Sequence, residues 1–85
     1  MRARGPAGPL TDFRVLDRSP GGLALASDYP LLIGSRLVLT LDAEGESFEI
    51  EVVVRWRSDR GTPHRFGVEF LTRDPRLARL LPLLA

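Results

Sequence analysis

The sequence predicts an all-β protein: a small antiparallel β-barrel or roll of about five or six short strands, followed by a short C-terminal helix. Three observations predict it. Several runs alternate apolar and polar residues with the period of two that half-buried strands show. Gly, Pro, Asp and Ser separate these runs at the spacing typical of small barrels. With 85 residues the chain forms one domain, so nearly every strand must supply the core.

The N-terminal half contains a leader and two short strands. Residues 1–9 are rich in Gly, Pro, Ala and Arg without periodicity, so we expect a flexible leader there. Residues 10–16 alternate as a half-buried strand does, and residues 22–27 form a second strand. The predicted barrel domain covers residues 10–73.

Three further strands complete the predicted barrel. Residues 35–41 lead through a hairpin loop, with Gly45 at a left-handed turn position, into the longest strand, residues 47–57. Residues 65–71 form the last strand. Strict alternation along the longest strand predicts an inward face with Trp56 as a core residue and an outward face of charged residues: inward Phe48, Ile50, Val52, Val54 and Trp56; outward Glu49, Glu51, Arg55 and Arg57.

Residues 74–85 have a helical pattern. Asp74 can cap a helix with Pro75 at its first position. Leucines then follow at helical spacing, at positions 77, 80, 81 and 84. The apolar stripe of this predicted helix either closes one end of the barrel or contacts another subunit.

Composition restricts compartment and partners. Because Cys is absent, the chain has no disulfide and no thiolate metal site, which suits a reducing compartment. It shows no signal-peptide core and no apolar run of membrane-spanning length, so we expect a cytoplasmic location without membrane insertion. A net charge of +1 argues against charge-driven binding to long nucleic acid.

The sequence offers little for catalysis. His64 is the only His and lies in a predicted loop, where a solvated role is usual. Glu49 and Glu51 share a strand face, but no further acid or metal ligand accompanies them. We therefore expect no enzyme, no catalytic residue, no metal and no cofactor.

The strongest candidate for ligand binding is Asp17-x-Ser19-x-x-Gly22, between two predicted strands. A carboxylate such as Asp17 can accept two parallel hydrogen bonds from the N1–H and the exocyclic amine of guanine. The Ser19 hydroxyl can donate or accept beside it, and Gly22 lets a flat ligand approach the backbone. The alternative is an ordinary turn, because Asp, Ser, Pro and Gly are common turn residues.

This motif resembles the second signature of the PilZ domain, a bacterial module that senses cyclic di-GMP. The resemblance continues, in family order, through four more segments: Gly22-Leu23-Ala24-Leu25, Gly34-Ser35-Arg36-Leu37, Val53-Val54-Arg55-Trp56 and Arg65-Phe66-Gly67-Val68-Glu69-Phe70. It implies a ligand site on the outside of the barrel, where the second motif reads a guanine edge. In the family, an Arg-x-x-x-Arg segment before the first strand grips phosphates and stacks on guanines.

That first motif is not matched here. One residue, not three, separates Arg2 from Arg4, and a strand that the family places between the two motifs is lacking. Arg18, Arg14, Arg4 and Arg2 are the remaining candidates for phosphate or stacking contacts. The resemblance thus implies a non-catalytic regulatory module with a partial cyclic di-GMP site, in which ligand binding orders the leader onto the barrel.

Two other functions fit the sequence. A PilZ-type adaptor that no longer binds nucleotide would act through protein contacts or self-association, through the predicted helix or a strand edge left open beside residues 10–16. A small nucleic-acid-binding barrel would use Arg55, Arg57 and Arg65.

Overall fold

Seven antiparallel strands form one sheet in the computed structural model, which describes residues 2–5, 8–10, 13–28, 30–43, 45–58, 60–61, 63–72 and 74–75. The strands are β1 (Arg2–Gly5), β2 (Gly8–Leu10), β3 (Arg14–Ser19), β4 (Gly22–Ser27), β5 (Arg36–Ala43), β6 (Glu46–Ser58) and β7 (His64–Phe70). Their order in the sheet is β2-β1-β5-β6-β7-β4-β3. The described residues contain no helix, so the all-β class is confirmed.

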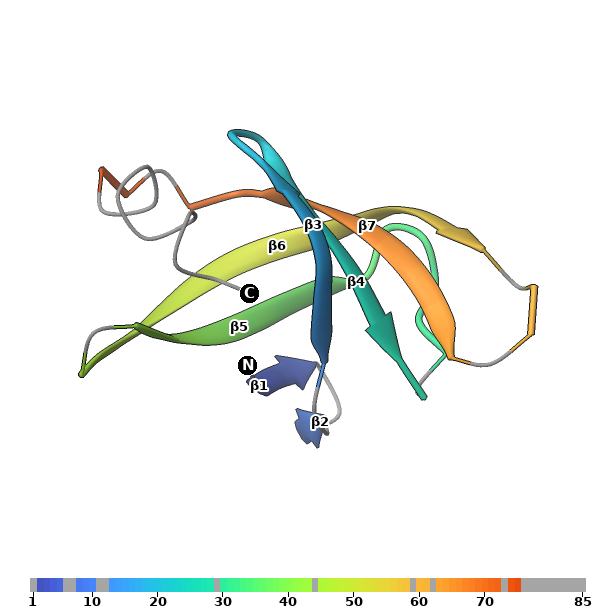
Figure 1. Cartoon of the computed structure of the whole chain (residues 1–85), viewed down its shortest axis with the longest axis horizontal. Helices are drawn as coiled ribbons and strands as arrows, with labels where there is room; N and C mark the ends of the chain where they lie inside the picture. The colour runs from blue at the N-terminus through green and yellow to red at the C-terminus, as the bar shows by residue number, and fades with distance from the viewer. Residues whose placement is uncertain are drawn as a thin grey trace.

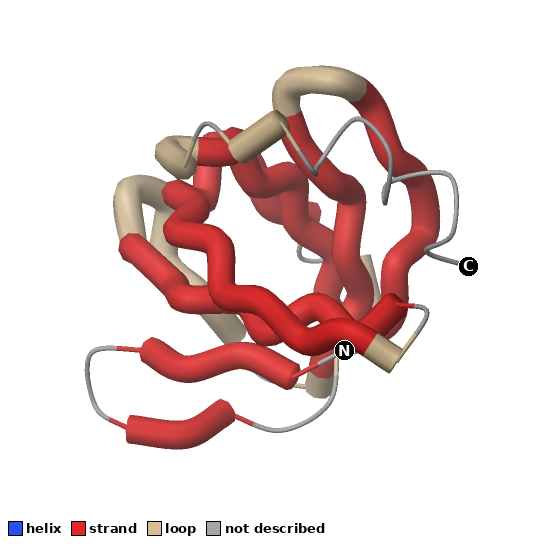
Figure 2. Tube along the Cα trace, turned by 90° about the vertical axis from the view of Figure 1, so that its left-hand side faces the viewer, coloured by secondary structure: helices blue, strands red, loops and turns tan. Residues whose placement is uncertain are grey.

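The sheet is rolled but open. Figure 1 shows β3 and β4 crossing over β5 and β6, and Figure 2 shows the sheet curling round on itself. β2 and β3 are the two ends of the strand order, and no ladder joins them among the described residues. Of the two predicted forms, barrel or roll, the described residues form an open roll with β3 as an edge strand, and a closed barrel is not formed.

The predicted leader contains two strands. β1 pairs with β5, with Arg2 opposite Thr40 and Arg4 opposite Val38, and β2 pairs with β1. Such pairing uses backbone N–H and C=O groups, which every residue here except proline supplies in full. It needs no alternation of side chains, which is why the pattern of residues 1–9 does not reveal it.

The core fills the inner face of the roll. Eleven buried apolar residues form one cluster, with side chains from β4, β5, β6 and β7 at its centre: Phe13, Leu23, Leu25, Leu31, Leu37, Leu39, Ile50, Val52, Val54, Phe66 and Val68. The rings of Phe13 and Phe66 are tilted by 52° with centroids 6.2 Å apart, a favourable aromatic arrangement. Alternate residues of these strands face away from the cluster, on what we call the outer face.

Two β-bulges interrupt the alternation. In β3 the register shifts between Val15 and Asp17, and in β6 it shifts between Val54 and Trp56. Each bulge places two residues opposite one on the partner strand, so the following side chains exchange faces. The prediction that Trp56 is a core residue is therefore wrong: Trp56 is 48% exposed.

The same shift changes the face of Arg57. It now lies opposite the core residue Phe66, and its Nη1 donates a hydrogen bond to the carbonyl oxygen of Leu31 at 3.2 Å. Its predicted outward position is corrected accordingly.

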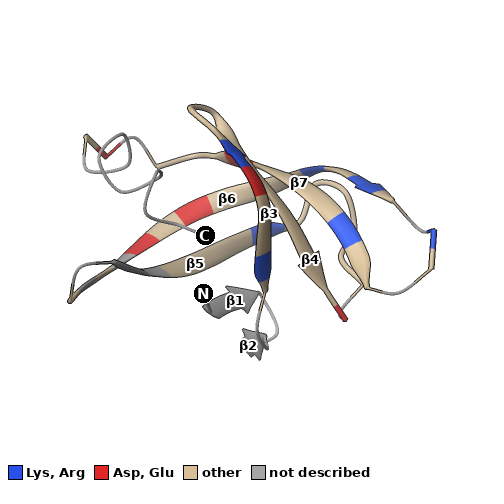
Figure 3. Ribbon diagram, viewed as in Figure 1, with Lys and Arg blue, Asp and Glu red and all other residues tan. Residues whose placement is uncertain are grey.

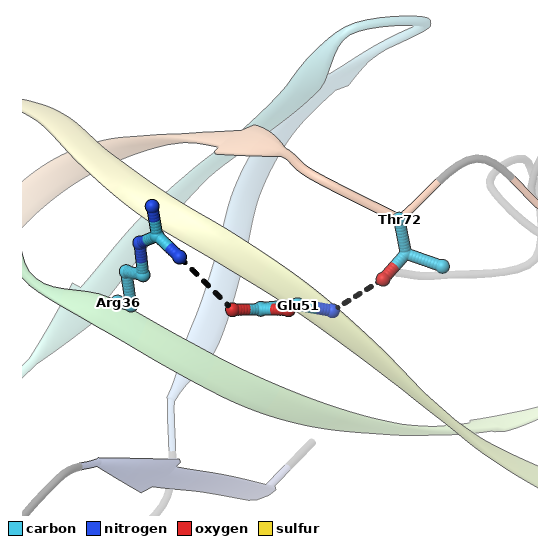
Figure 4. Close-up of polar contacts among 3 residues, drawn as sticks. All are labelled: Arg36, Glu51 and Thr72. Carbon is cyan, nitrogen blue, oxygen red and sulfur yellow. Dashed lines mark hydrogen bonds and ion pairs between the residues drawn. The ribbon is translucent and has the colours of Figure 1, made fainter.

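After β7 the chain returns to β6. Leu71 and Thr72 donate backbone hydrogen bonds to the carbonyl oxygen of Glu51, and the Thr72 hydroxyl accepts one from the Glu51 N–H at 2.8 Å (Figure 4). On the other side, the Glu51 carboxylate pairs with Arg36 at 3.8 Å. These contacts hold the segment after β7 against the middle of β6.

Smaller predictions have mixed outcomes. Gly45 has a φ of +78°, as the hairpin loop requires. β3 starts four residues later than the predicted strand 10–16. Of the predicted helix 74–85, only Asp74 and Pro75 are described, and they are not helical; its other residues lie outside the described part. The described residues include no helix long and apolar enough to cross a membrane.

Candidate functional site

The predicted motif lies on a strand. Asp17 and Ser19 belong to β3, Gly22 begins β4, and only Pro20 and Gly21 form the turn between them. The strand ladder holds Asp17 opposite Ala24 and Ser19 opposite Gly22. A ladder fixes the backbone direction of both residues, which a loop of the same composition does not.

Asp17 is the first member of a row that crosses four strands. Asp17 faces Ala24, Ala24 faces Gly67, and Gly67 faces Trp56. Directly opposite residues of an antiparallel sheet share one face. We call this line the central row; it lies on the outer face, with Asp17 and Trp56 exposed at its two ends.

The two bulges place both end residues of this row on the outer face. The bulge in β3 comes directly before Asp17, and the bulge in β6 comes directly before Trp56. Without them, strict alternation would place Asp17 and Trp56 on the inner face with Val15, which is partly buried, and Val54, which is buried. The two bulges therefore turn an acid and an aromatic ring outward on the same row.

The floor between them is made of small residues. A Cβ added to Gly67 would overlap the indole of Trp56, so the ring lies directly against the Gly67 backbone. Ala24 is the only side chain between this glycine and Asp17. The central row thus presents a flat surface with an aromatic plane at one end and a carboxylate at the other.

The neighbouring row of the outer face supplies the other polar groups. Ser19, Gly22, Glu69 and Val53 lie opposite one another in that order. The Ser19 hydroxyl donates to the carbonyl oxygen of Gly22 at 3.4 Å. Arg55, on the β6 bulge, pairs through Nε with Oε2 of Glu69 at 3.1 Å.

These two rows line a pocket of about 500 Å³. That volume is within the range of small-molecule sites, roughly 300–1,000 Å³. Its described lining includes four predicted site residues and the new residues from β6 and β7: Asp17, Arg18, Ser19, Gly22, Arg55, Trp56, Gly67 and Glu69.

The Asp17 carboxylate faces this pocket with most of its acceptor capacity available. Its Oδ1 accepts a hydrogen bond from the N–H of Arg18 at 2.8 Å. Within the described part of the chain, no ion pair joins it to a guanidinium. A carboxylate has about four lone-pair sites, so one local bond orients it and leaves the rest for a ligand.

The other predicted arginines lie elsewhere. Arg14 is exposed on β3 but does not line the pocket. Arg2 and Arg4 belong to β1, and four strands lie between β1 and β3 in the sheet: β5, β6, β7 and β4. Their side chains lie outside the described part of the structure.

Sequence reasoning missed Trp56, Arg55, Gly67 and Glu69 as site residues. One signal was present: a glycine inside a strand often marks a close approach by another group. Gly67 has that position in β7, and the group that approaches it is the Trp56 ring. The bulge in β6 left no trace in the alternation of the sequence, whereas in β3 the alternation ends at Leu16, next to the bulge.

The pocket has two carboxylates on the outer face, Asp17 and Glu69, and the Arg55 guanidinium pairs with Glu69. Arg18 also lines the pocket, but it lies opposite the core residue Leu23, so the register places it on the other side of the sheet from Asp17. Figure 3 shows acidic positions along one end of β6 and basic positions along its other end. A pocket of this kind suits a polar, uncharged group with hydrogen-bond donors better than a free anion.

A metal or catalytic site is not apparent in the described residues. They contain no group of three or more His, Cys, Asp or Glu that could hold a metal ion. His64 begins β7 opposite Ser27, away from the pocket, with Nδ1 buried and without a described hydrogen-bond partner. Arg55, Arg57 and Arg65 do not gather into one basic face: Arg55 and Arg57 lie on opposite sides of the sheet.

Comparison with protein families gives a match over most of the chain. The family model described as PilZ domain covers residues 3–84, nearly the whole chain. A search of curated proteins returned no match.

Proposed function

The chain belongs to the PilZ domain family, whose members are generally cyclic di-GMP-binding regulatory modules, and on this premise we propose that it is a non-catalytic module that binds cyclic di-GMP at the outer-face pocket. Asp17 reads the guanine edge, Ser19 supports that contact, and Gly22 permits close approach. Ligand bound there covers part of the outer face and so changes the surface available to a protein partner.

The observation that carries this proposal is the exposed Asp17 carboxylate at the wall of a pocket large enough for a base. Guanine presents two donors side by side, N1–H and the exocyclic amine. A carboxylate accepts both in a bidentate, charge-assisted contact. Because the Asp17 carboxylate has no described guanidinium partner, this part of the pocket favours the hydrogen-bond donors of a neutral base over the phosphates.

The small residues of the floor support the same function. The Trp56 ring covers Gly67, and Ala24 next to it carries only a methyl group, so a planar base can lie over Ala24 between the ring and Asp17. The Trp56 ring borders that surface and offers an apolar, aromatic contact. The floor thus fits the shape of a purine and the acid fits its edge.

Titration calorimetry with cyclic di-GMP tests the proposal. We expect saturable heats with the wild type and an affinity about 5- to 150-fold lower with Asp17→Ala, which corresponds to the 1–3 kcal/mol of a bidentate base contact. Asp28→Ala removes an exposed carboxylate just after β4 and is the matched control, with wild-type affinity.

A second function is favoured by a separate observation. The N-terminal arginines belong to a strand paired with β5, and β3 is an open edge among the described residues. An adaptor that binds a protein partner through this edge needs no nucleotide. The same calorimetry separates the two: a wild type without heat at millimolar cyclic di-GMP would support the adaptor and contradict nucleotide binding.

A further inference from the structure

We propose that Arg14 and Arg65, which lie on neighbouring strands of the outer face, bind the phosphate of the ligand whose guanine occupies the pocket. This inference rests on the proposed function and extends it. It names the ligand class as a guanine nucleotide with a phosphodiester, and it assigns the phosphate contact to two arginines that no linear motif joins.

The strand register brings the two arginines together. Arg14 of β3 lies opposite Ala26 of β4, and Ala26 lies opposite Arg65 of β7. We call this line the arginine row. With strands about 4.8 Å apart, the two Cα atoms are about 10 Å apart, within joint reach of two long side chains.

The arginine row is next to the central row on the same face. Leu25 and Phe66, which are buried in the core, separate the two rows along β4 and β7. Two residues of strand correspond to about 7 Å. Because a ribose links the base of a nucleotide to its phosphate, one guanosine phosphate can reach from the pocket to the arginine row.

Nothing described in the arginine row neutralises its charge. Its members are Arg14, Ala26, Arg65 and Ser58, none of them acidic. Arg14 and Arg65 are exposed, and no described ion pair involves either of them. Ala26 between them is 2% exposed, as expected for a small residue between the aliphatic stems of two long ones.

Charge therefore divides the outer face into two parts. The pocket contains two acids and two arginines, and its Arg55 already pairs with Glu69. The arginine row carries two positive charges. A phosphate gains more from two guanidiniums without an ion pair among the described residues, whose planar forks match its oxygens, than from a guanidinium that must first leave a carboxylate.

This arrangement would take the place of the unmatched Arg-x-x-x-Arg segment. In that segment the arginines are close in sequence, whereas here they come from positions 14 and 65 and meet through β4. The sequence shows neither the proximity nor the shared face, because both depend on the register of β3, β4 and β7.

Calorimetry with cyclic di-GMP tests the ligand contact. We expect Arg14→Ala and Arg65→Ala each to lower the affinity about tenfold or more, as for the loss of a charge-assisted hydrogen bond, and to flatten its salt dependence. Arg60→Ala removes an exposed arginine from the turn before β7 and serves as the control. Wild-type affinity in both test variants would overturn the inference and leave the proposed function intact.

A second measurement uses pyrophosphate, which has no base. We expect it to shift the Nε–Hε NMR signals of Arg14 and Arg65 and not that of Arg60. If cyclic di-GMP does not bind but pyrophosphate shifts these two signals selectively, the proposed function fails and the anion site stands. Equal shifts of all arginine signals would overturn the inference.

Discussion

Gly22 allows β4 to lie very close to the backbone of β7. A Cβ added to Gly22 would overlap the carbonyl oxygen of Val68 and lie 3.0 Å from its carbonyl carbon. Both are backbone atoms of β7 and cannot rotate away. Gly22 of the motif is thus required by the packing of β4 against β7, whether or not a ligand approaches it.

Gly22→Ala should therefore destabilise the protein, by an amount of about 1–3 kcal/mol typical of overpacking. Gly21→Ala is the matched control, because a Cβ there meets no atom within 4 Å. Urea unfolding followed by circular dichroism measures both. Equal midpoints for the two variants would show that the β4–β7 contact is looser than described.

At the scale of the element, the bulges determine which side chains of β3 and β6 lie on the outer face. β6 alternates regularly up to Val54, and the bulge then turns Trp56 outward. Truncating a fully buried core tryptophan to alanine costs about 3–5 kcal/mol of stability. Trp56 is half exposed on the outer face, so its truncation removes fewer packing contacts and should cost less.

Trp56→Ala should accordingly cost less stability than Leu39→Ala, although it removes the larger side chain. Leu39 is fully buried in β5, and its truncation should cost about 2–5 kcal/mol. Chemical unfolding ranks the two variants. A larger loss for Trp56→Ala would mean that the ring lies in the core and that β6 is not bulged there.

These elements also show how far the sequence can predict the structure. Alternation predicted β5, β6 and β7, whose inner faces are apolar and whose outer faces carry charged residues, and β4 was predicted as a short strand after the motif. It could not predict β1 and β2, which are held through backbone pairing with β5. The sequence motif pointed to Asp17 and Ser19, which do line a pocket, but the strand geometry and Trp56 were missed, since a bulge depends on how two strands pair.

At the scale of the whole molecule, the rolled sheet places the hydrophobic core and the proposed ligand site on opposite faces. The inner face carries the apolar cluster, and the outer face of β3, β4, β7 and β6 carries the pocket and the arginine row. Ligand contacts can therefore change without removing core side chains. The roll brings residues 14–24 and 53–69 into one surface, although they are far apart in the chain (Figure 1).

The central claim is that guanine binds between Asp17 and Trp56. Because Trp56 is the only tryptophan, its fluorescence reports on the pocket directly. We expect cyclic di-GMP to change the emission saturably in the wild type, with a weaker apparent affinity in Asp17→Ala and no loss in Asp28→Ala. Emission that stays constant while calorimetry records binding would place the ligand elsewhere and contradict the account.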